Sequence, residues 1–327
     1  MNKHHISKRI VFACIALLLI FVMVFSGFKI WDSVVPSQES PADNAFVSKT
    51  ITRDGIDYFP RQDLTVFLIM GIDRTGPVES SDSYNNEGAA DVAMLAIFDE
   101  QAEEYRILTL NRDTMLNMPV LGIGGKPAGT AYGQLALAHT YGSGLEDSCE
   151  NTRKAISDFL YGLNIDYYVS MNMDAIGILN DAVGGVKVNV TEDFSDVDDS
   201  IPMGEVVLNA EQALSYVQSR QGVGDQLNLS RMERQQKYVT GFMESLKSKL
   251  ESSENFAIEL YNNVSEYMIS DCSVNTLSSV INRFSDYTLS EIVTPEGENM
   301  KGTTYMEFHA DEERLDELIL RLFYVEK

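Results

Sequence analysis

The 327-residue chain carries 25 Lys and Arg against 49 Asp and Glu, a formal net charge of −24 at pH 7. An acidic surface of this kind repels polyanions, so nucleic acid is excluded as the main partner, because affinity for it comes largely from phosphate neutralisation. Hydrophobic residues make up 44% of the chain, which is ample for a core once a membrane segment is set aside.

The N-terminal segment predicts a membrane anchor. Residues 10–30 are almost wholly apolar and supply roughly the 20 residues that cross a bilayer. Three basic residues precede them, which predicts a cytoplasmic tail over 1–9 and an extracellular main domain. A cleaved signal peptide is the rival interpretation, but its apolar core is usually shorter, and VFSGF is a poor cleavage site. The polar, Pro-containing residues 31–60 predict a stalk.

From residue 61 onward, strand and helix patterns alternate. Apolar runs predict strands over 64–73, 91–99, 105–113, 165–173, 186–190, 290–295 and 303–309. Amphipathic stretches predict helices over 146–162, 174–185, 209–220, 229–250 and 311–325. Asn209 and Gln212 have the spacing of a capping box at the start of one of these helices. The alternation predicts one domain over 61–327, a three-layer α/β/α sandwich around a central mixed β-sheet, preceded by one transmembrane helix.

The strands over 91–99 and 105–113 are joined by the short polar loop EQAEE, which predicts a β-hairpin. If the loop is centred on Ala102, the numbers of paired residues add to about 204, so Asp91 and Asp113 lie opposite each other, with Cβ atoms about 5 Å apart. Two carboxylates at that distance destabilise the pair unless a cation or proton lies between them, and Mg²⁺ suits such oxygen ligands. In the alternative interpretation the register differs by one or two residues, and both aspartates cap strand ends in water.

Several arginines follow the predicted strands or surround the stretch SRQGVGDQLNLSRMERQQ. These candidates for binding a pyrophosphate are Arg74, Arg112, Arg220, Arg231 and Arg234. Guanidinium groups bind phosphate bidentately and keep their charge, and Arg231 also lies near a helix N-terminus, which favours anions. Any one of them is more often a solvated surface residue, and only their combination with the aspartate pair favours a site. Arg234 faces either the site or a neighbouring carboxylate.

Two cysteines, Cys149 and Cys272, follow the predicted anchor. An exported domain lies in an oxidising compartment, where thiols pair readily, so we predict a disulfide between them. The alternative is two buried thiols.

Two further features carry no catalytic motif. The Gly-rich segment 122–133 lacks the order of residues of a nucleotide P-loop and predicts a mobile lip over the site. None of the four histidines has a zinc-ligand or Ser-His-Asp spacing, and His139 is expected to be a packed helix residue.

In this order, these pieces resemble the LytR–CpsA–Psr family of cell-wall phosphotransferases, from about Leu64 to near Leu250. They are GID, ADVAML, NRDTM, LALAHTYG, IDYYVSMNMDAI, DAVGGVKVNV, LNAEQALSYVQSR and GDQLNLSRMERQQ. The resemblance implies transfer of a glycopolymer from an undecaprenyl-pyrophosphate carrier to peptidoglycan, as a phosphodiester, by a protein held in the cell membrane by a single span. It also implies that an apolar groove beside the arginines, built partly from LALAHTYG and YVTGFMESL, holds the polyprenyl tail.

The resemblance also assigns roles to residues. Asp91 corresponds to the aspartate of the family's RSDT-like motif, and Arg112 and Asp113 to its PRDT motif, with Asn111 in place of proline. These carboxylates would hold Mg²⁺, and the arginines would hold the pyrophosphate oxygens. Arg112 would assist catalysis, and either Asp113 or Asp73 would be the base.

Two positions depart from the family pattern. Ala89 and Gln218 stand where the family usually has arginine. Their neutral side chains leave open a second function, that of a non-catalytic polyprenyl-pyrophosphate binding protein of the cell envelope.

Overall fold

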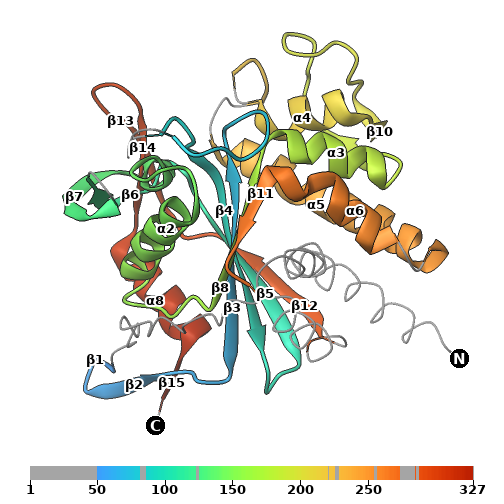
Figure 1. The fold of residues 1–327 in the computed structure, drawn as a ribbon. Helices are drawn as coiled ribbons and strands as arrows, with labels where there is room; N and C mark the ends of the chain where they lie inside the picture. Colours follow the sequence, from blue (N-terminus) through green and yellow to red (C-terminus); the bar gives the residue numbers. More distant parts are fainter. Residues whose placement is uncertain are drawn as a thin grey trace, which may run out of the picture.

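A computed structural model describes residues 50–81, 86–122, 125–219, 221–224, 228–253, 256–272, 284 and 287–326. Its centre is a six-stranded sheet of order β11-β8-β3-β4-β5-β12 (Figure 1). The strands are β3 (Leu64–Ile72), β4 (Ala90–Asp99), β5 (Glu104–Leu110), β8 (Tyr167–Asn172), β11 (Met268–Ser270) and β12 (Thr288–Val293). β8 runs parallel to β3 and β12 runs parallel to β5, while the other neighbours are antiparallel, so the predicted mixed sheet is confirmed.

Helices cover both faces of the sheet, because β3 and β4 are apolar on both sides and have to be buried on both (Figure 1). The first face packs against α3 (Asp174–Ala182), α4 (Ala210–Gln218), α5 (Asn228–Ser252) and α6 (Phe256–Val264). The second face packs against η4 (Leu135–Thr140), α2 (Glu146–Phe159) and α8 (Glu312–Phe323). Alternate residues of β3 serve the two cores: Phe67 lies in the first and Leu68 in the second.

Shorter pairings surround this sheet. They are the hairpins β6 (Met115–Leu121) with β7 (Pro127–Gln134), β9 (Val186–Val190) with β10 (Gly204–Leu208), and β13 (Gly297–Lys301) with β14 (Met306–Ala310). The segment predicted as a Gly-rich lip therefore contributes a regular strand, β7. β1 (Ile51–Arg53) and β2 (Ile56–Pro60) form a separate sheet with β15 (Tyr324–Glu326), and η5 (Ser265–Tyr267) precedes β11. Residues 51–60, which we predicted as the last part of the stalk, contain β1 and β2, and β2 pairs with the C-terminal strand β15.

The predicted anchor over 10–30 lies outside the described residues, as does the tail before it. Within the described ranges, no helix is both long enough and apolar enough to cross a membrane. The anchor therefore stays a prediction from the sequence.

The predicted disulfide was wrong. Cys149 and Cys272 are both buried thiols that are not joined. Cys149 lies on α2 in the core of the second face and donates to Ser170 Oγ at 3.3 Å, whereas Cys272 belongs to the core of the first face. The sheet separates them, and burial raises the pKa of each thiol to about 12, so neither is a ready nucleophile.

The capping box at α4 is confirmed. Asn209 Oδ1 accepts from Gln212 N at 2.9 Å, and Gln212 Oε1 accepts from Asn209 N at 3.1 Å. The capping box fixes where α4 begins. The last residue of α4, Gln218, lies at the end of the sheet that carries the candidate site.

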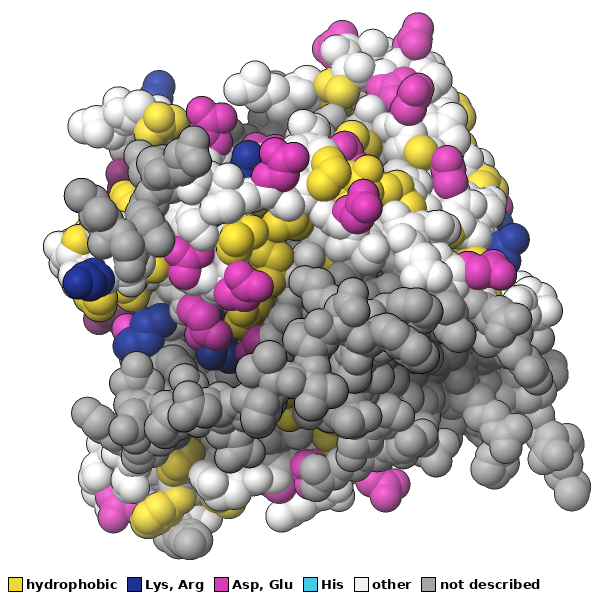
Figure 2. All heavy atoms as spheres, viewed as in Figure 1, with side chains coloured by type: hydrophobic (Ala, Val, Ile, Leu, Met, Phe, Trp, Pro, Cys, Tyr) yellow, Lys and Arg dark blue, Asp and Glu magenta, His cyan; other side chains and the backbone are white. Residues whose placement is uncertain are grey.

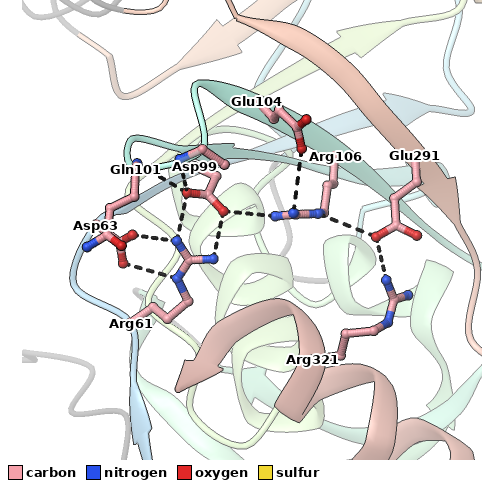
Figure 3. A network of polar contacts seen from close by, with 9 residues as sticks. Arg61, Asp63, Asp99, Gln101, Glu104, Arg106, Glu291 and Arg321 are labelled. Carbon is pink, nitrogen blue, oxygen red and sulfur yellow. Dashed lines mark hydrogen bonds and ion pairs between the residues drawn. The ribbon is translucent and has the colours of Figure 1, made fainter. Parts of the chain in front are cut away.

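A network of charged side chains connects neighbouring segments at the other end of the sheet, away from the candidate site (Figure 3). The buried Asp99 accepts two hydrogen bonds of 2.7 Å from Arg61 and one of 3.1 Å from Arg106. Burial alone would raise the pKa of Asp99, but these bonds and one from Ala102 N lower it well below its usual range. The carboxylate thereby joins the start of β3 to the β4–β5 turn.

Replacing Asp99 with Ala should lower the free energy of unfolding by about 3 kcal/mol, because two arginines lose a buried partner. Asp63→Ala is the matched control: Asp63 is partly exposed and pairs with Arg61 alone, so the loss there should be under about 1 kcal/mol. Urea titrations of the two variants measure both changes. Equal losses would contradict a special role for Asp99.

Candidate functional site

The β4–β5 hairpin has a register that differs by one residue from the predicted one. Ala93 pairs with Leu110 and Asp99 with Glu104, so the numbers of partners add to 203 rather than 204. Continued to the open end, this register places Arg112, not Asp113, opposite Asp91. An ion pair results: Arg112 Nη1 lies 2.8 Å from Asp91 Oδ1. The cation that separates the carboxylates here is a guanidinium group.

A second arginine reaches Asp91 from helix α5. Arg231 Nη1 donates to Asp91 Oδ2 at 3.0 Å, and both side chains are buried. The carboxylate of Asp91 therefore lies between two guanidinium groups from distant parts of the chain. The first turn of a long helix also adds a positive potential at this point. The cluster can balance negative charge on a ligand without any change of protonation.

Asp113 lies beside the same cluster but is buried, with 2% of its surface exposed. β5 stops at Leu110 because Asn111 makes a turn: its Oδ1 accepts from Asp113 N at 3.0 Å, and its carbonyl accepts from Thr114. The Asp113 carboxylate accepts from Gln134 Nε2 at 2.8 Å and lies 3.8 Å from Arg112 Nε. Its contacts are those of a group that orients Arg112.

Asp73, at the end of β3, is the exposed carboxylate of the site. Desolvation by the surrounding protein, followed by the nearby charge of Asp91, raises the pKa of Asp73. Arg112, Arg231 and a hydrogen bond from Gln218 oppose that rise. A reachable carboxylate with a raised pKa is the type of group that can accept a proton from a substrate.

The other predicted arginines are placed differently. The side chain of Arg74 lies against Gly88 and Gly144, on the side of α2. Arg234 is buried: it donates to the Tyr216 carbonyl at 3.1 Å and to Glu192 at 2.5 Å, and it lies over the Phe194 ring. It also donates to the carbonyl of Ser219. Of the two alternatives for Arg234, the structure shows the one with a carboxylate partner.

Arg220 lies outside the described residues. Its proposed contact with a pyrophosphate stays a prediction from the sequence.

A cavity of about 350 Å³ runs from this cluster between the sheet and the helices of the first face. Its walls are largely apolar side chains, among them Ile69, Met94, Ile107, Ile176, Tyr238 and Phe242. Asp91, Gln218 and Arg231 line the polar part. The cavity extends to Leu289 and Ile292 on the edge strand β12. The predicted apolar groove beside the arginines is therefore present, with a wall from YVTGFMESL, whereas LALAHTYG packs on the second face.

The donor set fits a divalent cation of the Mg²⁺ type. No group of three or more His, Cys, Asp or Glu side chains gathers for a metal ion in the part of the chain that the structure describes. Mg²⁺ is usually held by only one or two carboxylates together with substrate phosphates and water. Asp91 and Asp73 interact electrostatically, and Asp91 Oδ1, although ion-paired, accepts no hydrogen bond. Asp91 is therefore the best-placed protein ligand, since Asp113 is engaged by Gln134.

His139 is a packed residue, as expected. Its Nδ1 lies 2.7 Å from the Gly88 carbonyl, which fixes the proton on Nδ1. Burial lowers the pKa of His139 to about 4, against the opposing effect of the Gly88 carbonyl. The ring stays neutral in the folded protein.

Since the unfolded chain binds a proton at His139 near pH 6.5 and the folded chain only near pH 4, stability should fall as the pH falls through this window. The loss should approach about 3 kcal/mol. His139→Gln should lack this dependence. Urea titrations of both chains from pH 7 to 4.5 measure the difference in their free energies of unfolding. Taking the difference cancels the titration of other groups, such as Asp271, because burial raises the pKa of Asp271 to about 6 in both chains. A difference independent of pH would contradict the assignment.

Two glutamines of the site, Gln134 and Gln235, were not predicted from the sequence. Gln134 holds Asp113, and no local pattern points to it, because the contact joins the end of β7 to a turn 21 residues away. Gln235 lines the cavity and donates to the Val217 carbonyl at 3.1 Å. Its position four residues after Arg231 on the same helix is a signal that could have found it.

A mixed α/β domain that joins carboxylates and guanidinium groups to an apolar cavity defines a protein suited to an amphiphile with an anionic head group. The chain belongs to the LytR_cpsA_psr family, whose model matches residues 35–322. It is 28% identical over 305 residues to the polyisoprenyl-teichoic acid--peptidoglycan teichoic acid transferase TagU of Enterococcus faecalis. This alignment covers 93% of this chain and 90% of that protein.

Solved structures share the fold. The crystal structure of Bacillus subtilis TagV superposes with a TM-score of 0.60 at 20% identity, over 80% of this chain and 96% of that one. A structure of TagT bound to LI-WTA has a TM-score of 0.59 at 20% identity, over 85% of this chain and 96% of that one.

Proposed function

We propose that this chain transfers a glycopolymer from an undecaprenyl-pyrophosphate carrier to peptidoglycan, forming a phosphodiester bond. The observation that carries the proposal is the apolar cavity that ends at Asp91 and Arg231. A polyprenyl pyrophosphate has the same two-part character, an apolar tail and a polyanionic head. The names of the relatives, teichoic acid transferases, support a glycopolymer as the transferred group.

In the proposed reaction a hydroxyl oxygen of the acceptor attacks the phosphorus next to the glycopolymer. The bond from that phosphorus to the bridging oxygen breaks, polyprenyl phosphate leaves, and the hydroxyl proton passes to Asp73. Asp73 is preferred to Asp113 as the base because it is exposed, whereas Asp113 is buried and bonded to Gln134. Arg112 and Arg231 stabilise the charge that develops on the phosphoryl oxygens.

A bound Mg²⁺ would supply further neutralisation of the pyrophosphate, with Asp91 as its protein ligand. Asp113, predicted as the second metal ligand, is less well placed for this role because it is buried and bonded to Gln134. We also place the domain on the outer side of the cell membrane, held by the predicted single span over 10–30, because lipid carrier and peptidoglycan meet there.

The competing proposal, a binder without turnover, draws on one observation: Gln218, at the position of a usual arginine, bonds to Asp73 and adds no charge. Incubating the full chain with Mg²⁺, a labelled lipid-linked glycan and peptidoglycan oligomers separates the two. Mass analysis should show oligomers that gain the glycan phosphate. Binding of the lipid without any such product would establish the binder instead.

A further inference from the structure

The hairpin β6–β7 forms a neutral surface on an acidic protein. Residues 115–145 contain no Asp or Glu and a single Lys, in a chain with 49 acidic residues. Acidic side chains are spread widely over the face shown in Figure 2. A surface with almost no charged groups offers few ion pairs, so it suits an uncharged partner recognised by shape and hydrogen bonding.

One exposed tyrosine lies on this surface, and a second lies in the neighbouring β13–β14 turn. Tyr132 of β7 is 62% exposed, and Tyr305, in the β13–β14 turn, is 68% exposed. Tyr132 and Gln134 point to the same side of β7 because strand residues alternate, and Asn117 lies opposite Tyr132 on β6. Leu116 and Met118 point the other way, into the core of the second face.

Gln134 connects the two segments that carry these tyrosines to the candidate site. Its Nε2 donates to Asp113 Oδ1 at 2.8 Å and to the carbonyl of Met306, the neighbour of Tyr305, at 2.7 Å. The Asp113 carbonyl in turn accepts from Phe308 N of β14 at 2.8 Å. Two segments more than 170 residues apart in sequence, each with an exposed tyrosine, thus meet at one edge of the site.

This edge lies on the opposite side of the sheet from the lipid cavity. The hairpin packs on the core of the second face, whereas the cavity is walled by residues of the first face such as Ile69 and Met94. The donor and a second substrate can therefore approach the end of the sheet from two sides without competing for space.

We infer that Tyr132 and Tyr305, with Asn117 and Gln134, form a binding surface for the sugar rings of a neutral glycan, the acceptor strand. Exposed aromatic rings stack on the apolar faces of pyranose rings, and amide side chains bond to sugar hydroxyls. The identification of this glycan as the acceptor rests on the proposed function, but its binding does not.

The test is calorimetric titration of the full chain with a hexamer of β-1,4-linked N-acetylglucosamine, a neutral probe free of lipid and phosphate. Tyr132→Ala and Tyr305→Ala should each weaken binding about tenfold. Tyr132→Phe, which keeps the ring, should restore it. Tyr161→Ala is the matched control: Tyr161 is 40% exposed at the end of α2, away from Gln134, and should change nothing.

The same variants are then titrated with polyprenyl pyrophosphate, and all should bind it like the wild type. No binding of the hexamer by the wild type, or unchanged binding by both alanine variants, overturns the inference while leaving the proposed function standing. Hexamer binding that depends on the tyrosines, in a chain that neither binds nor consumes the lipid, supports the inference and overturns the proposed function.

Discussion

Replacing Asp73 with Asn is expected to lower the rate of transfer by about 10²–10⁴-fold while donor binding stays near that of the wild type. The amide keeps the size of the side chain but cannot accept the hydroxyl proton, and general bases contribute about that much. The raised pKa of Asp73 gives the test a pH signature. The carboxylate is the active form, so the wild-type rate should rise with pH through that raised pKa and level off above it, and the variant should lack this limb.

Gln218→Ala tests the same assignment from the other side. The hydrogen bond from Gln218 holds the pKa of Asp73 down, so removing it should move the acidic limb of the profile to higher pH. Single-turnover rates with a lipid-linked glycan, measured from pH 4 to 8, give both profiles. An Asp73→Asn chain with a wild-type rate and the same acidic limb would show that another group is the base.

Replacing Arg231 with Lys is expected to lower the transfer rate by about 10²–10³-fold, the usual effect of removing one preorganised group that stabilises developing charge. Lysine keeps the positive charge but loses the planar fork that contacts Asp91 and that, in the proposed reaction, also contacts a phosphoryl oxygen. Arg112 still pairs with Asp91, so the carboxylate is not left alone and the fold should persist. Transfer rate, lipid affinity and the urea midpoint are measured together.

Arg234→Lys, three residues further along α5, is the matched control. Arg234 donates to the carbonyls of Tyr216 and Ser219 and to Glu192, so its loss should appear mainly as a lower urea midpoint. The two variants should thus separate, one in rate and the other in stability. If Arg231→Lys transfers as fast as the wild type, the guanidinium of Arg231 acts only as a partner of Asp91.

The sequence by itself determined the elements. The apolar runs of β3 and β4 are buried on both faces wherever they lie, so their strand character and the helices on either side follow from the pattern alone. The capping box of Asn209 and Gln212 is equally local, since its atoms lie within four residues. Asp91, Arg112 and Arg231 could be selected from motifs, because each lies at the end of an element that the pattern defines.

Only the tertiary structure decided what these side chains contact. A one-residue difference in the β4–β5 turn changed the neighbour of Asp91 from a carboxylate to a guanidinium, because every pairing in a hairpin follows from its turn. Cys149 and Cys272 were separated by the sheet, and Gln134 was brought to Asp113 and Met306, by packing between distant segments. Such contacts depend on how layers close over one another, which no local periodicity encodes.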